Sequence, residues 1–337
     1  MLNLLATCVY PDDLSKKYIS NKNFSLNKQF ILFILSCKRY YSYANIYVFT
    51  NKKKLVNSML QKYNRSKNIY LLPEENNFDL THCENHSGEH FTYAFSKLDA
   101  IHCYKKSKYY NPSQNIILTD LDAILLPKKV SDLKFFFSKD PIAIDYKNEL
   151  EYGFNLHKVI NKINKKTKLQ NQENGLKDHW INSGFLILNK NMIKDIKENS
   201  KSLVENLIKK RVYAKKMIDH YSDEIVFSSF FKNNNGKGIP NVLDNKIANF
   251  YWTTKTKTKT LEYLSFHDYP LHVHLPASKY QNNFYLALKN IINSPIKFPD
   301  KFEVFFIILL INFYGFYGRK LRPFLSKWIK KIIFFHK

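Results

Sequence analysis

Short apolar runs alternate with longer segments of helical periodicity through the first half of the chain. The apolar runs are rich in aliphatic and aromatic residues, which is typical of buried strands. They occupy residues 2–10, 45–50, 68–73 and 115–120. Amphipathic or helix-like segments separate them, at residues 28–43, 52–63 and 90–106. Strands joined by helices of this length predict an α/β fold with a mostly parallel central sheet flanked by helices.

The second half of the chain is less regular. Strand-like runs occupy residues 141–146 and 179–190, and residues 222–231 begin like a helix. Polar or low-complexity stretches, which predict loops and exposed connections, occupy residues 161–179, 233–238 and 253–260. A short histidine-rich segment, HDYPLHVHLP, follows at residues 267–276.

The last fifty residues combine apolar and basic character. Residues 304–318 carry no charge, but this run is shorter than the roughly 20 residues that cross a bilayer. Beyond it, apolar residues recur at helical spacing (Leu321, Phe324, Leu325, Trp328, Ile332) among basic ones (Arg319, Lys320, Lys327, Lys330, Lys331). A basic amphipathic helix with an interfacial Trp suits an anionic membrane surface. We therefore expect residues 286–337 to form a helical, membrane-associating tail, with a core helix or an oligomer contact as the alternative.

The overall composition narrows the classes of protein. Of the 337 residues, 45% are hydrophobic and 16% are aromatic, which suffices for a core and excludes a disordered chain. Only 8 residues are Gly, and neither G-x-x-x-x-G-K nor G-x-G-x-x-G occurs, so Walker and Rossmann nucleotide sites lack their anchors. The net charge of +25 suits nucleic acid, anionic lipid or phosphorylated substrates. Because Lys and Asn are abundant throughout, local clusters carry more information than this total.

Cysteine usage and the first residues bear on location. The four cysteines, Cys8, Cys37, Cys83 and Cys103, show no paired spacing, which is typical of free thiols in a reducing compartment. The opening MLNLLATCVYPDD has no basic lead-in and only a short apolar run, so it predicts a first strand rather than a signal peptide. We expect a cytoplasmic protein, peripheral at the inner face of the membrane.

Two carboxylates, Asp120 and Asp122, interrupt the apolar run NIILTDLDAILL at residues 115–126. Ionised carboxylates are costly among apolar groups, and two close together repel each other. A divalent cation resolves both problems, because hard cations take carboxylate oxygens as ligands. Residues i and i+2 of an extended backbone point to the same side, so both side chains can share one metal ion. The alternative is an acidic turn between two apolar segments.

Three further segments carry polar groups next to apolar runs. Asn182, Ser183 and Gly184 precede FLIL and suit either a plain turn or a site. Asp223 and Glu224 follow Ser222, where either a capped helix start or a catalytic carboxylate is expected, and both roles are compatible. His272 and His274 would share one face of a strand as metal ligands or as structural side chains.

The order of these segments (strand, TDLD, NSGFLIL, SDE, HVHLP) resembles that of glycosyltransferases of the GT-A fold, over roughly residues 2–280. It looks most like the metal-dependent, family-8-like group that uses nucleotide-sugar donors. The resemblance implies a catalytic domain at residues 1–285, with a nucleotide-sugar half to about residue 126 and an acceptor half at residues 127–285. It also implies transfer from a nucleotide-diphosphate donor, such as a UDP-sugar, to a glycan or lipid-linked acceptor of the surface polysaccharide type.

The resemblance also implies roles for single residues. Asp120 and Asp122, with His272 or His274, would bind Mn²⁺ or Mg²⁺ against the donor diphosphate. Thr7, Lys97 and Lys279 would approach the nucleotide and its phosphates. Asn182, Ser183 and Gly184 would border the transferred sugar, and Asp223 or Glu224 would lie near the anomeric carbon or the acceptor. The family often ends in His-x-x-Gly-x-x-Lys-Pro-Trp, and this chain lacks that Gly, Pro and Trp.

Three other interpretations compete with the transferase. A phosphatase of the haloacid dehalogenase type also has Asp-x-Asp after a strand, but it expects Thr at the position of Ile124. A non-enzymatic basic protein that binds membranes or nucleic acid would explain the charge but not TDLD, and no nucleic-acid-binding signature occurs. The residues His82, Cys83, His86 and His90 have spacings that suit zinc, although the polar residues between them favour a loop.

Overall fold

The computed structural model divides the chain into two compact units. Unit 1 comprises Met1–Asp13, Tyr43–Asp120 and Lys129–Asp244, and unit 2 comprises Leu14–Ser42, Leu121–Lys128 and Asn245–Lys337. The structure describes residues 2–10, 26–64, 66–72, 80, 95–128, 141–145, 181–209, 222–233, 241–242, 248–250, 269, 271–274, 282–295 and 300–312. The proposed zinc residues, Lys279 and residues 313–337 lie outside these ranges.

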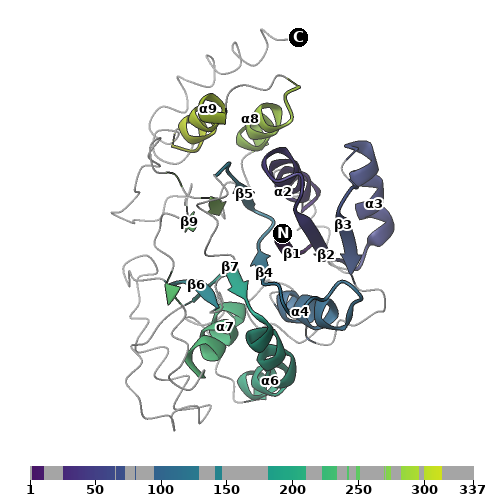
Figure 1. Ribbon diagram of the computed structural model, residues 1–337, viewed down its shortest axis with the longest axis vertical. Helices are drawn as coiled ribbons and strands as arrows, with labels where there is room; N and C mark the ends of the chain where they lie inside the picture. The colour runs from purple at the N-terminus through teal and green to yellow at the C-terminus, as the bar shows by residue number, and fades with distance from the viewer. Residues whose placement is uncertain are drawn as a thin grey trace. The chain divides into compact units, whose positions relative to one another are not determined.

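Unit 1 is built on a seven-stranded sheet with the order β3-β2-β1-β4-β7-β6-β8 (Figure 1). Its strands are β1 (Asn3–Thr7), β2 (Asn45–Phe49), β3 (Ile69–Leu72), β4 (Ile116–Thr119), β6 (Ile142–Asp145), β7 (Ile181–Leu188) and β8 (Asn241–Val242). Strand β7 runs antiparallel to both of its neighbours, and the remaining pairs are parallel. The predicted mostly parallel α/β sheet is therefore confirmed.

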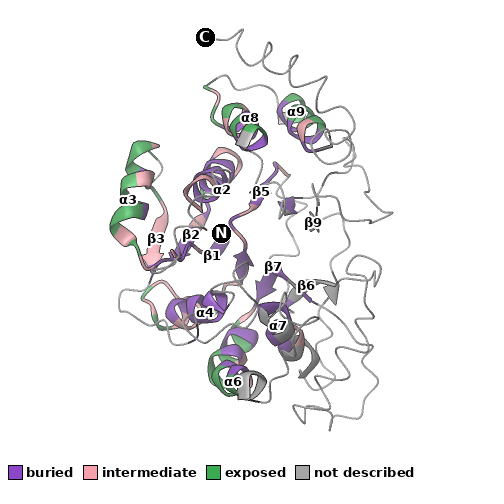
Figure 2. Ribbon diagram, turned by 180° about the vertical axis from the view of Figure 1, so that it is seen from behind, coloured by how far each residue is buried: buried purple, intermediate pink, exposed green. Residues whose placement is uncertain are grey.

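Helices of unit 1 supply the other half of its core. They are α3 (Lys53–Lys62), α4 (Ser96–Lys106), α6 (Lys190–Lys209) and α7 (Ser222–Asn233). One buried cluster joins side chains of β1, β2, β4 and β7 to side chains of α4, α6 and α7. Figure 2 shows that α4 is mostly buried, whereas α3 exposes most of its length and buries only Val56 and Leu60. Among the strands, helix α4 therefore packs mainly against β1 and β2.

The strand order reverses between β1 and β4. From β1 the chain proceeds through β2 and β3 on one side, and then returns to place β4 on the other side of β1. Open α/β sheets bind ligands beyond the carboxyl ends of the strands at such a reversal. In the parallel pairing Ala6 lies opposite Thr119, so Thr7 and Asp120 are the next residues in line. The fold thus brings two predicted site residues to the same point of the sheet edge.

Strand β7 carries an irregularity beside that point. Its pairing with β6 shifts between Ala143 and Ile144, whose partners are Leu186 and Asn182. Three residues of β7 therefore have no counterpart on β6, as in a β-bulge, which re-aims side chains next to functional sites. On the other side of β7, Asp120 N donates a hydrogen bond to the carbonyl of Gly184 at 3.2 Å.

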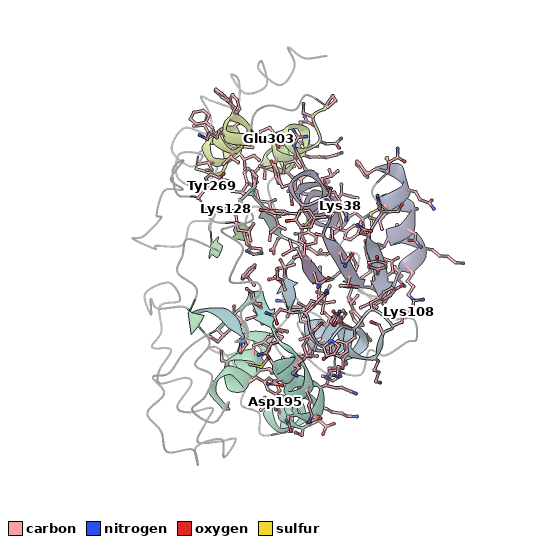
Figure 3. All side chains as sticks on the ribbon, viewed as in Figure 1. Lys38, Lys108, Lys128, Asp195, Tyr269 and Glu303 are labelled. Atoms are coloured by element: carbon pink, nitrogen blue, oxygen red, sulfur yellow. The ribbon has the colours of Figure 1, made fainter. Side chains whose placement is uncertain are left out.

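Unit 2 contains a smaller sheet and three described helices. The sheet has the order β5-β10-β9, with strands β5 (Ala123–Leu125), β9 (Ala248–Phe250) and β10 (His272–His274). Helices α2 (Leu26–Tyr40), α8 (Asn282–Ile292) and α9 (Asp300–Asn312) accompany it. Ser36 of α2 accepts a hydrogen bond from Leu125 N, and the Tyr41 hydroxyl donates one to the carbonyl of Leu126 at 2.7 Å. Figure 3 shows Lys128 beside Tyr269, with the ammonium 4.7 Å from the ring centroid.

A buried glutamate fastens α9 to α2. Glu303 is 2% exposed, and its carboxylate accepts hydrogen bonds from the Arg39 guanidinium and the Tyr40 hydroxyl. The same guanidinium donates to the carbonyl of Ser294, just after α8, at 2.8 Å. Charge-assisted hydrogen bonds of this kind fix both position and orientation. No described helix is both long enough and apolar enough to cross a bilayer.

One detail of the predicted elements was wrong. Strand β4 ends at Thr119, and Leu121 and Asp122 form a turn before β5, so the two aspartates do not lie on one extended strand and the alternative of a turn holds. The strand expected at residues 179–190 is confirmed by β7, which contains residues 182–184 and so removes the alternative of a plain turn there. Pairing with a distant segment decides where β4 ends, which a single strand pattern does not reveal.

Candidate active site

Four predicted site residues of unit 1 meet around one ammonium group. Lys97 projects from α4, and its Nζ lies 2.6 Å from Asp120 Oδ1 and 2.9 Å from Asp223 Oδ2. It also donates to Ser183 Oγ at 2.9 Å and lies 3.2 Å from the Ser183 carbonyl oxygen. The partners come from the end of β4, from β7 and from the first turn of α7, so tertiary structure alone brings them together.

The two carboxylates of this cluster keep the Lys97 side chain charged. Burial by itself lowers the pKa of Lys97, but the charges and hydrogen bonds of Asp120 and Asp223 outweigh burial and raise that pKa above its usual range. Lys97 therefore stays an ammonium at neutral pH although it is only 7% exposed. Two carboxylates face one ammonium here, so the cluster attracts further positive charge.

Ser183 and the start of α7 hold Asp223 in place. The Ser183 hydroxyl donates to Asp223 Oδ2 at 2.7 Å while its oxygen accepts from Lys97. Asp223 and Glu224 occupy the first helical turn, where the helix dipole favours acidic side chains, and both are buried. The capped-helix and catalytic interpretations are thus compatible, because Asp223 serves the helix start and also faces Lys97.

The remaining predicted ligands lie in unit 2 or beyond the described side chains. Asp122 is half-exposed in the turn before β5, and His272 is fully buried on β10. The backbone of His274 lies opposite Ala123 in the antiparallel pairing, whereas His272 lies opposite Leu125. The side chains of Asn182 and His274 are outside the described part of the structure, so their roles stay predictions.

The described residues suit a divalent cation in their chemistry. Asp120 is 23% exposed at its side chain, so the carboxylate that pairs with Lys97 is also accessible from solvent. Carboxylate oxygens are the ligands that Mg²⁺ and Mn²⁺ prefer. Among the side chains that the structure describes, no group of three His, Cys, Asp or Glu residues is arranged to hold a metal ion.

No family model and no curated protein matches this chain. Solved glycosyltransferase structures resemble its fold. One is the galactosyltransferase LgtC in complex with donor and acceptor sugar analogs (TM-score 0.46, 10% identity, 90% of this chain, 99% of that one). Another is mouse xyloside xylosyltransferase 1, with a TM-score of 0.44, 12% identity, and 81% of this chain and 97% of that one covered. A third is GlyE of Streptococcus pneumoniae, with a TM-score of 0.42, 13% identity, and 81% of this chain and 54% of that one covered.

Sequence reasoning missed two polar groups at the same sheet edge. Tyr10 N donates to Asn51 Oδ1 at 2.8 Å, and Asn51 Nδ2 donates to the Tyr10 carbonyl at 2.6 Å. Their position a few residues after β1 and β2 is the signal that would have found them, because ligands meet the carboxyl ends of parallel strands. Cys8, which directly follows β1, is not suited to be a nucleophile, since burial raises the pKa of its thiol to about 12 despite the opposing hydrogen bond with Tyr10.

Proposed function

We propose that this chain is a metal-dependent glycosyltransferase that moves a sugar from a nucleotide-diphosphate donor to a glycan or lipid-linked acceptor. The observation that carries the proposal is the meeting of Lys97, Asp120, Ser183 and Asp223 in one buried cluster at the carboxyl edge of the sheet. The resemblance had implied roles around the donor and the transferred sugar for Lys97, Asp120 and Ser183, and a role near the anomeric carbon or the acceptor for Asp223 or Glu224. An ordinary surface ion pair would not unite them.

The chemistry of the cluster suits the departure of a nucleoside diphosphate. As the glycosidic bond breaks, negative charge develops on the diphosphate, and a fixed ammonium such as Lys97 stabilises it without supplying a proton. Asp223 would stabilise the other product, because the sugar gains positive charge as an oxocarbenium-like species and a carboxylate is negatively charged. Lys97 is thus suited to the negatively charged product and Asp223 to the positively charged one. The hydrogen bond between the two side chains fixes their separation.

In this proposal Asp120 and Asp122 hold the divalent cation, either Mn²⁺ or Mg²⁺. When bound, the cation would neutralise the diphosphate as a Lewis acid. Of the two late histidines, His274 is the better candidate ligand, because its backbone pairs with the residue that follows Asp122. His272 pairs two residues further along β5 and is fully buried.

The other predicted residues take positions around the donor. Thr7, next in line to Asp120, would meet the nucleotide, together with Tyr10 and Asn51 beyond the same strands. Gly184 and the side chains of Asn182 and Ser183 would border the transferred sugar, and Lys279 would contact phosphate. Glu224 would assist at the acceptor. A UDP-sugar donor, a surface polysaccharide or lipopolysaccharide product and a site at the inner face of the membrane complete the proposal.

A thermal-shift screen of nucleotide sugars tests the proposed function. A ligand that binds only the folded state raises its stability by RT ln(1 + [L]/Kd), which is about 2.7 kcal/mol at a hundredfold excess over Kd. We expect one or more UDP-sugars to raise the melting temperature of the full chain with Mn²⁺ present, and to raise it much less with EDTA. Slow release of the nucleoside diphosphate in the same mixtures would report hydrolysis of the donor.

Two outcomes would count against the transferase. Hydrolysis of a simple phosphate ester with Mg²⁺, and no response to any nucleotide sugar, would favour the phosphatase. Binding to DNA that weakens steeply with salt, again without nucleotide-sugar affinity, would favour a basic binding protein.

A further inference from the structure

Helix α9 has two apolar faces, of which one is buried and the other is exposed. Glu303, Val304, Ile307, Ile308 and Ile311 are buried against unit 2. The opposite face carries large apolar side chains at i, i+3, i+4 and i+7, namely Phe302, Phe305, Phe306 and Leu309, which are 40–60% exposed. Most of the exposed large apolar side chains of the described chain lie on this helix, and Leu286 of neighbouring α8 adds another.

This exposed face is an ordered feature of the fold. The contacts of Glu303 with Arg39 and Tyr40, and of Arg39 with the carbonyl of Ser294, fix the rotation of α9 about its own axis. Figure 3 labels Glu303 on α9, and Figure 2 shows exposed residues along the same helix. A contiguous apolar stripe held outward in this way is a mark of an interaction surface.

The charge of the adjoining sequence indicates the partner. Residues 313–337, which follow α9 directly, contain no Asp or Glu and seven basic residues: Arg319, Lys320, Arg322, Lys327, Lys330, Lys331 and Lys337. A second copy of the chain would bring two such basic segments together, which is unfavourable. An anionic bilayer attracts them, at about 1 kcal/mol for each Lys or Arg near the surface.

We propose that the exposed face of α9 docks on an anionic lipid bilayer, with Phe302, Phe305, Phe306 and Leu309 entering the interface. Because the opposite face of α9 is buried against the rest of unit 2, the exposed face can enter the membrane only from its surface, with the described helix lying in that plane. The inference gives a docking face to the membrane location in the proposed function, but its observations come from unit 2 alone, so it can fail while the transferase activity stands. Its effect would be to concentrate the protein where lipid-linked acceptors are found.

Vesicle sedimentation of the full chain, without any sugar donor, tests this inference. We expect wild-type protein to bind vesicles of phosphatidylcholine with phosphatidylglycerol more tightly than vesicles of phosphatidylcholine alone. The variant Phe305→Ser/Phe306→Ser should bind about a hundredfold more weakly, since transfer of one phenylalanine side chain out of water contributes about tenfold. A matched control, Tyr43→Ser/Leu55→Ser, removes two equally exposed apolar side chains elsewhere and should bind like wild type.

Three results would overturn the inference. The first is equal binding of the Phe305→Ser/Phe306→Ser variant and wild type, or no preference of wild type for the anionic vesicles. The second is a Phe305→Ser/Phe306→Ser variant that loses self-association in ultracentrifugation but still binds vesicles as wild type does. That result would assign the exposed face of α9 to contact with a second copy of the chain. The third is a clear fall in the melting temperature of the variant, because truly exposed substitutions change stability by only about 0.5 kcal/mol.

Discussion

Replacing Lys97 by methionine is expected to lower both stability and turnover sharply. Lys97→Met keeps the length of the side chain but leaves Asp223 buried without its counter-charge. Breaking a buried ion pair in this way costs about 3–5 kcal/mol, because a lone buried charge remains. Losing a group that stabilises developing negative charge lowers turnover by about 10²–10³-fold. Urea unfolding and donor turnover with Mn²⁺ measure the two effects.

Two further variants separate the roles of Lys97 in folding and in chemistry. Lys97→Met/Asp223→Asn removes both charges, so it should recover most of the lost stability while turnover stays low. Lys106→Met makes the same change at an exposed position of the same helix and should affect neither property. If Lys97→Met turns over the donor at the wild-type rate, the cluster is only structural.

Asp122→Asn is expected to abolish most turnover while the protein stays folded. The substitution preserves size and removes one charged oxygen ligand at a half-exposed turn, so the free energy of unfolding should change little. A cation that neutralises a leaving diphosphate contributes several kcal/mol, so turnover should fall about a thousandfold or more. Nucleoside diphosphate release at saturating UDP-sugar and Mn²⁺ measures the effect.

Asp195→Asn is the matched control for this change. Asp195 is also half-exposed and hydrogen-bonds to Asn199 one turn along α6, far in sequence from every predicted ligand. The Asp195→Asn variant should turn over the donor at the wild-type rate. Equal rates for Asp122→Asn and Asp195→Asn would remove Asp122 from the metal site.

The elements that the sequence predicts best are short, uninterrupted apolar runs. Strands β2, β3 and β4 were each expected within a residue or two, because all their positions except Asn45 and Thr119 are apolar and each run is bounded by polar residues or Pro. Helix α6 was not predicted, since its 20 residues are mostly Lys, Asn, Ser and Glu and only a narrow stripe, including Ile193 and Ile196, is buried. The antiparallel direction of β7 could not be predicted from its own residues, because it depends on the long connection between β6 and β7.

The candidate site was predictable in its residues but not in its contacts. The resemblance implied roles at a transferase site for Lys97, Asp120 and Ser183, and for Asp223 or Glu224. Their joint hydrogen bonding was not foreseen, since Lys97 and Asp223 are 126 residues apart and meet only once α4 and α7 pack on the same sheet. The premise of one extended strand through both aspartates was wrong for a similar reason: β4 ends where its pairing with β7 ends, at Thr119.

The decisive test of the metal site is anomalous diffraction at the manganese edge, from crystals of the full chain with Mn²⁺ and UDP. We expect one strong peak within coordination distance of the carboxylates of both Asp120 and Asp122, with an imidazole of His272 or His274 as a further ligand. A peak located elsewhere, or bound UDP with no manganese at these two aspartates, would contradict it.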